Sequence, residues 1–162
     1  MPLVTSKEML QKAQQGGYAV GAFNAENMEM VKAIIQAAEE VKAPVMIQTT
    51  PSTVKYGTVE TYAALVAAEA AKASVPVCLH LDHGDSFELA MQAIHAGYTS
   101  VMIDGSKLDF EGNVALTKKV ADVARSLDIP CEAELGKVGG KEDDLEAEAD
   151  TNTDPSEAKE FA

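Results

Sequence analysis

A chain of 162 residues, 46% of them hydrophobic, is long enough for one domain with a substantial hydrophobic core. Its formal net charge of −13 argues against nucleic acid or an anionic membrane surface as a partner, because both are bound through basic patches. Part of this charge is local, since residues 132–148 are dense in acids, and we expect most of that segment to be a solvated loop.

Cysteine use and the lack of targeting segments indicate a soluble, cytoplasmic protein. Cys78 and Cys131 both fall in apolar, strand-like runs, which is typical of buried thiols in a reducing compartment. The first residues lack the basic and apolar regions of a signal peptide. No apolar run approaches the ~20 residues that a membrane helix needs.

Five short apolar runs alternate with helical patterns along the chain. The predicted strands are 18–24, 44–50, 76–83, 99–104 and 129–135. The first helix is predicted to open with a capping box, Thr5-Ser6-Lys7-Glu8, and to close at Gly16 and Gly17. Further helices are predicted through 31–38, from 59 towards 74, from 86 to 97, through 116–127 and from Asp154 onwards. Strands separated by helices favour a parallel sheet, and no pair shows the spacing of an antiparallel hairpin.

The run His80-Leu81-Asp82-His83-Gly84 is the stretch that points most directly to chemistry. Side chains alternate along a strand, so His80 and Asp82 should share one face, while His83 lies where the strand turns out. An acid between two imidazoles at the carboxyl end of a strand is typical of a metal or proton-transfer site. A buried ion pair with a structural histidine is the alternative.

Polar residues finish all five predicted strands. They are Asn24, Gln48 with Thr50, Asp82 with His83, Asp104, and Glu134. All but His83 share one alternation register, so the strands deliver polar groups to one end of the sheet. Sites are built at that end in a βα barrel, and the crevice of an open doubly wound sheet lies at the same end. If one strand ended in a polar residue, polar capping of the barrel rim would explain it. Because five strands do so, we favour a functional site.

These segments together resemble the class II, metal-dependent ketose-bisphosphate aldolases, in the subgroup of bacterial fructose- and tagatose-bisphosphate aldolases. The segments that match in order and spacing are 17–20, 23–24, 80–84, 95–97, 100–106, 132–136 and 139–144. The resemblance implies an α/β fold, the (β/α)8 TIM barrel, of which this chain covers about the first five βα units. Residues 1–162 would then be the N-terminal part of a single barrel domain, truncated at Ala162.

The resemblance also implies an activity. It is zinc-dependent aldol cleavage or condensation of a ketose 1,6-bisphosphate, fructose or tagatose, with dihydroxyacetone phosphate and glyceraldehyde 3-phosphate as the smaller partners. A divalent metal polarises the ketone, and a separate base removes the C4 hydroxyl proton. Such an enzyme serves glycolysis or related carbohydrate metabolism.

Site residues follow from the same resemblance. His83 corresponds to a ligand of the catalytic zinc, and Asp82 to the general acid/base at the C4 oxygen. Asp104 and Glu134 correspond to ligands of a possible second cation. Glu142, on a loop with two glycines, corresponds to the residue that exchanges the dihydroxyacetone-phosphate proton.

Substrate contacts and partners are implied as well. Asn24 and Thr50 lie where the family contacts substrate, Thr50 near the aldehyde-side phosphate. We expect His80 to orient Asp82 or to pack inside the barrel. The implied partner is a phosphorylated sugar, with no nucleic acid and no membrane, and family members are usually homodimers or homotetramers.

Two alternatives stay open, because the family's other two zinc-binding histidines and its phosphate loops would lie beyond this chain. One is a complete, open flavodoxin-like α/β domain; against it, no glycine-rich phosphate loop follows the first strand. The other is a non-catalytic barrel partner or scaffold; against it, a scaffold has no use for the proton-transfer pair Asp82 and Glu142.

Overall fold

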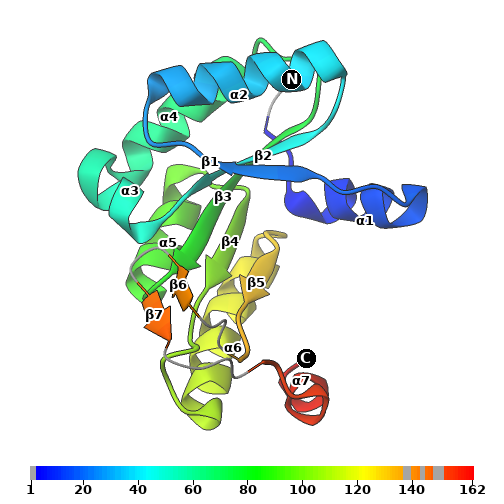
Figure 1. The fold of residues 1–162 in the computed structure, drawn as a ribbon. Coiled ribbons are helices and arrows are strands. Elements are labelled where there is room, and N and C mark those ends of the chain that lie inside the picture. Colours follow the sequence, from blue (N-terminus) through cyan, green and yellow to red (C-terminus); the bar gives the residue numbers. More distant parts are fainter. Residues whose placement is uncertain (1–2, 137–139, 143–144, 148–151) are drawn as a thin grey trace.

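Strands and helices alternate along the chain, as the sequence predicts (Figure 1). The computed structural model describes residues 3–136, 140–142, 145–147 and 152–162. The helices are α1 (Ser6–Gly16), α2 (Met28–Val41), α3 (Pro51–Gly57), α4 (Val59–Ala70), α5 (Phe87–Ala96), α6 (Phe110–Ser126) and α7 (Pro155–Phe161). The strands are β1 (Gly21–Asn24), β2 (Val45–Thr49), β3 (Val77–Gly84), β4 (Ser100–Ile103), β5 (Cys131–Ala133), β6 (Gly140–Glu142) and β7 (Leu145–Ala147).

The first five strands form one parallel sheet in chain order, β1-β2-β3-β4-β5. Each new strand is therefore added at the same edge, as in the wall of a βα barrel. A flavodoxin-like sheet reverses direction after its first strands and carries helices on both faces. The alternative of an open flavodoxin-like domain is therefore wrong.

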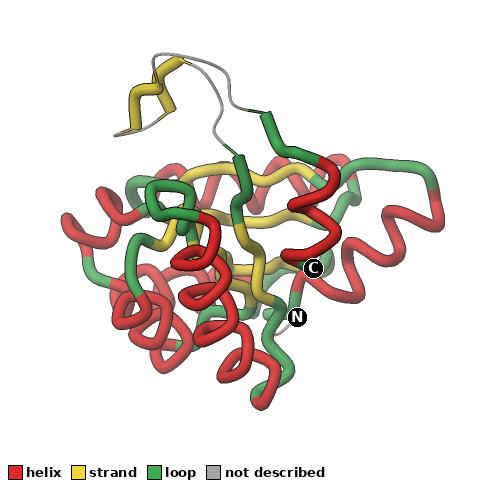
Figure 2. Tube along the Cα trace, turned by 90° about the horizontal axis from the view of Figure 1, so that it is seen from below, coloured by secondary structure: helices red, strands yellow, loops and turns green. Residues whose placement is uncertain are grey.

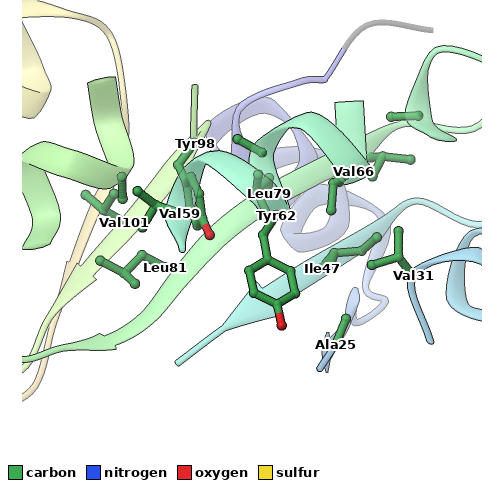
Figure 3. Packing of buried hydrophobic residues seen from close by; sticks show 14 of the residues in the cluster. Ala25, Val31, Ile47, Val59, Tyr62, Val66, Leu79, Leu81, Tyr98 and Val101 are labelled. Carbon is green, nitrogen blue, oxygen red and sulfur yellow. The ribbon is translucent and has the colours of Figure 1, made fainter. Parts of the chain in front are cut away.

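Helices α2, α4, α5 and α6 pack side by side against one face of this sheet (Figures 1 and 2). Alternate strand residues point at them, among them Ile47, Leu79, Leu81 and Val101, each fully buried (Figure 3). Full burial of a large aliphatic side chain contributes about 1.5–3 kcal/mol, so this layer is the main source of stability.

The opposite face of the sheet carries a smaller apolar cluster, which α1 covers at the amino ends of the strands. Met9 of α1 packs on Met46 and Cys78, and the Val4 N–H donates to the Val77 carbonyl over 2.9 Å. Farther along, this face becomes polar. A single row runs across four strands, with Asn24 opposite Gln48, Gln48 opposite His80, and His80 opposite Ser100.

Local expectations are partly wrong. Gly17 does end α1, with φ +66°, but the N-cap Thr5 makes no side-chain hydrogen bond, so the capping box is absent. Helix α3 was not expected; it starts at Pro51, a residue favoured in the first turn, and Thr58 then caps α4. Cys78 is buried as predicted, whereas Cys131 is only half-buried.

The acidic segment also differs from expectation. Strands β6 and β7 pair antiparallel, whereas the sequence was expected to give a loop there and no hairpin (Figure 2). The following helix α7 begins as predicted, with the Asp154 carboxylate accepting from the N–H groups of Ser156 and Glu157. In the described part of the chain, no helix has the length and apolar character needed to cross a membrane.

Candidate metal and catalytic site

His83 leaves the strand alternation because of its own backbone. Its φ is +48°, in the left-handed region that residues other than glycine rarely adopt, and the pairing of β3 with β4 shifts register between Leu81 and Gly84. A Cβ on Gly84 would lie 2.5 Å from the Met102 carbonyl oxygen, so only glycine lets β3 approach β4 here. Strained backbone of this kind is found mostly at functional sites.

The turn at His83 places its ring between two carboxylates. Its Nδ1 lies 3.1 Å from Asp104 Oδ2 and 3.4 Å from Glu134 Oε2. The hydrogen bond with Asp104 outweighs burial and raises the pKa of His83 to about 9. Burial alone would raise the pKa of Asp104, but hydrogen bonds from His83 and Ser106 lower it to about 2. At neutral pH His83 is therefore an imidazolium that is hydrogen-bonded to the Asp104 carboxylate.

The same three side chains fit a divalent cation. Each offers one ligand atom, and the three atoms lie within 4.8 Å of one another. Tetrahedral zinc with ligands at about 2.0–2.2 Å separates them from each other by roughly 3.3 Å, close to the two distances given above for His83. An imidazole nitrogen with carboxylate oxygens is a zinc-type donor set, and the ion would displace the ring proton.

Both carboxylate residues are held from outside the cluster. The Ser106 N–H donates to Asp104 Oδ1 over 2.9 Å. The Asn113 side-chain amide donates to the Glu134 carbonyl oxygen over 2.8 Å. Asn113 is 3% exposed, and Gly105 faces its side chain so closely that a Cβ there would lie 2.2 Å from Asn113 Oδ1.

Sequence reasoning missed Asn113, although a signal was present. It precedes Thr117, Val120 and Ala124 at helical spacing, so it occupies the sheet-facing stripe of α6. A polar residue in such a stripe needs a buried partner, which here is the Glu134 carbonyl.

Two cavities meet at His83. One is lined on its polar side by Asp82, His83, Glu132 and Glu134. The other contains His83 and Asp104 together with Thr50, Ser52, Lys107 and the start of α5. The structure thus brings the predicted residues Asp82, His83, Asp104 and Glu134 together, and Thr50 lines the second of these cavities.

The remaining predicted site residues are placed differently. Thr50 is buried, and its hydroxyl is hydrogen-bonded to Ser52 and Thr53. Asn24 is exposed, one row nearer the amino ends than Asp82, and is absent from the linings of both His83 cavities. Glu142 lies in β6, and its side chain is outside the described residues.

Comparison with known proteins agrees with this geometry. The family model described as fructose-bisphosphate aldolase class-II matches residues 4–162. A Bacillus subtilis (strain 168) protein named "Probable fructose-bisphosphate aldolase" is 52% identical over 99% of this chain and 58% of its own length. The crystal structure of the YdjI aldolase from Escherichia coli K12 superposes with a TM-score of 0.87 at 38% identity, covering 98% of this chain and 57% of that one. Fructose-bisphosphate aldolase from Campylobacter jejuni shares the fold, with a TM-score of 0.73 at 23% identity over 87% of this chain and 49% of that one.

The fold and site define an α/β protein of parallel βα units with a cation-type cluster at the carboxyl ends of its strands. The chain belongs to the class II fructose-bisphosphate aldolase family, whose members are generally metal-dependent and act on phosphorylated sugars. It spans about half the length of the relatives just described, from 49% to 58%.

Proposed function

We propose that this chain is part of a zinc-dependent aldolase that cleaves fructose 1,6-bisphosphate, with tagatose 1,6-bisphosphate as the second candidate substrate. The observation that carries the proposal is the cluster of His83, Asp104 and Glu134 within a chain that the family model matches along residues 4–162. Residues 1–162 would form the first part of one barrel domain. The complete protein would act in the cytoplasm, in glycolysis, as a homodimer or homotetramer.

His83 would hold the catalytic zinc, and Asp104 and Glu134 would hold a second cation or share the first. The geometry supports a shared ion, because the two carboxylates lie 3.1 and 3.4 Å from the same ring nitrogen, whereas the separate second cation rests on the family resemblance. When bound, the ion supplies Lewis-acid polarisation of the substrate ketone. The Ser106 N–H holds the Asp104 carboxylate, and Asn113 holds the backbone carbonyl of Glu134, so both ligand-bearing residues are anchored independently of the ion.

Asp82 would be the general acid/base. Its carboxylate takes the proton of the C4 hydroxyl while the C3–C4 bond breaks, so that C4 leaves as an aldehyde and the bond electrons remain on C3. In condensation the same proton returns to the C4 oxygen. Support comes from position, since Asp82 is adjacent to His83 and lines the same cavity. Glu142 would exchange the proton at C3 of the three-carbon product.

Thr50 and Asn24 would contact substrate. Thr50 is better placed, because it lines a cavity with His83 and Asp104, next to Ser52 and Lys107. A hydroxyl and an ammonium group together suit a phosphate oxygen. Asn24 lies farther away, in the polar row that includes Gln48 and His80.

The test is a coupled aldolase assay of the protein as its host makes it, with fructose or tagatose bisphosphate, before and after chelation and zinc repletion. We expect chelator-sensitive cleavage that zinc restores. Asp82→Asn should lower kcat at least 100-fold with little change in fold, whereas Asp122→Asn, on the exposed face of α6, should change nothing. Cleavage that persists after complete metal removal would refute the proposal, and no turnover on any ketose bisphosphate would favour the non-catalytic barrel partner.

A further inference from the structure

Four polar side chains form a chain of contacts from α1 to the cavity that contains Asp82. They are Ser6, Ser100, His80 and Glu132. Ser6 Oγ of α1 lies 3.0 Å from Ser100 Oγ of β4, and Ser100 Oγ lies 2.8 Å from His80 Nδ1 of β3. On the other side of the ring, His80 Nε2 lies 3.7 Å from Glu132 Oε2 of β5. Ser6, Ser100 and His80 are each at most 3% exposed, so water does not supply their hydrogen bonds.

His80 is neutral, because burial lowers its pKa to about 4. It therefore carries one ring proton, and its two neighbours decide which nitrogen holds it. The Ser100 hydroxyl can donate or accept, whereas the mostly exposed Glu132 carboxylate only accepts. The proton accordingly belongs on Nε2, which leaves Nδ1 to accept from Ser100, and Ser100 in turn to accept from Ser6.

The opposite tautomer would direct the Nε2 lone pair at a carboxylate oxygen. Such an arrangement brings two acceptors face to face and loses one favourable contact. The Glu132 carboxylate therefore selects the Nε2–H tautomer, and the Ser100 and Ser6 hydroxyls complete it by supplying a donor to Nδ1. The Nε2–H group faces the Glu132 carboxylate 3.7 Å away, an electrostatic contact longer than a hydrogen bond, and the Glu132 side chain lines the cavity that contains Asp82 and His83.

We propose that His80 is a positioning residue that directs the Glu132 carboxylate into the Asp82 cavity, where Glu132 accepts a hydrogen bond from a substrate hydroxyl. The proposal rests on the aldolase function proposed above. An open-chain ketose bisphosphate has hydroxyls on three adjacent carbons, so a carboxylate beside Asp82 is placed for one that Asp82 does not use.

The tautomer is read by 15N NMR of histidine-labelled protein at neutral pH. We expect His80 to show the Nε2–H tautomer, and Ser100→Ala to shift it towards a mixture because Nδ1 loses its donor. Ser100→Thr keeps the hydroxyl and should restore the wild-type spectrum. His95, exposed at the end of α5, is the internal control whose signal should not move. An Nδ1–H tautomer in the wild type would overturn the proposal.

Kinetics test the coupling to substrate. His80→Gln places an amide nitrogen near the position of Nε2, and His80→Asn places one near Nδ1. We expect His80→Asn and Glu132→Gln to lower kcat/KM roughly 10- to 100-fold, as for loss of a hydrogen bond to a charged group, mainly through KM. His80→Gln should retain most activity. If a His80 variant does not fold, Ser100→Ala supplies the same comparison.

The two proposals fail in different ways. Wild-type turnover with equal kcat/KM in His80→Asn, His80→Gln and wild type would overturn the positioning role alone. A wild type without turnover on either sugar bisphosphate would overturn the aldolase function and the substrate contact with it, whatever the tautomer.

Discussion

Replacing Asn113 by alanine tests how the candidate metal ligands are held. The substitution leaves the Glu134 carbonyl without its 2.8 Å donor, and a side chain that is 97% buried shrinks to a methyl group. An unsatisfied buried acceptor costs about 1–3 kcal/mol and the residual cavity roughly 1 kcal/mol more, so we expect the free energy of unfolding to fall by about 2–4 kcal/mol. Because the residue that loses its anchor is Glu134, zinc affinity should also fall, roughly 10- to 100-fold.

Urea unfolding of metal-free protein, followed by circular dichroism, measures the first effect, and competition with a chromophoric chelator measures the second. Thr117→Val is the matched control, because it removes the 3.2 Å hydrogen bond to Asn113 Oδ1 and leaves the Glu134 carbonyl paired. It should cost about 1 kcal/mol and leave zinc affinity unchanged. Asn113→Ala with wild-type stability and wild-type zinc affinity would refute the reasoning.

Three further predictions use other parts of the same region. His80 has a folded pKa near 4 against an ordinary 6.5, so the unfolded chain binds its proton first. The contribution of His80 to the free energy of unfolding is complete above pH 6.5, and about 3 kcal/mol of it is lost as the pH falls to 4. His80→Gln should therefore reduce the dependence of the free energy of unfolding on pH in this range, as measured by urea unfolding. An unchanged pH dependence would contradict this prediction. His83→Gln should weaken zinc binding more than 100-fold by isothermal titration, against no change for His95→Gln. Gly84→Ala should lower the thermal midpoint by several degrees, because its Cβ would meet the Met102 carbonyl oxygen at 2.5 Å; an unchanged midpoint would mean that β3 and β4 separate at little cost.

The general plan of the site was predictable from sequence. Alternation along a strand places His80 and Asp82 on one face, and parallel strands present their carboxyl ends together, so Asp104 and Glu134 were expected near His83. The five strands were found in order because each is an apolar run bounded by helical spacing. These signals depend only on residues close together in the chain.

Features that depend on packing between distant segments were not predictable. The left-handed backbone at His83 follows from the register shift between β3 and β4, which no local pattern encodes. Thr5 occupies a capping position, but its hydroxyl makes no cap hydrogen bond. Asn24 ends its strand like Asp82, yet pairing register places it level with His80.

The three candidate ligands come from the ends of β3, β4 and β5, which are neighbours both in the sheet and along the chain. A cation bound there would link the carboxyl ends of three adjacent strands and would resist their separation. Its binding should slow amide hydrogen exchange in the segment from 77 to 135 far more than in β1 and β2. The strands before β3 carry the candidate substrate contacts Asn24 and Thr50 instead. The candidate metal ligands therefore lie on one continuous stretch of the chain, and Asn24 and Thr50 lie outside it.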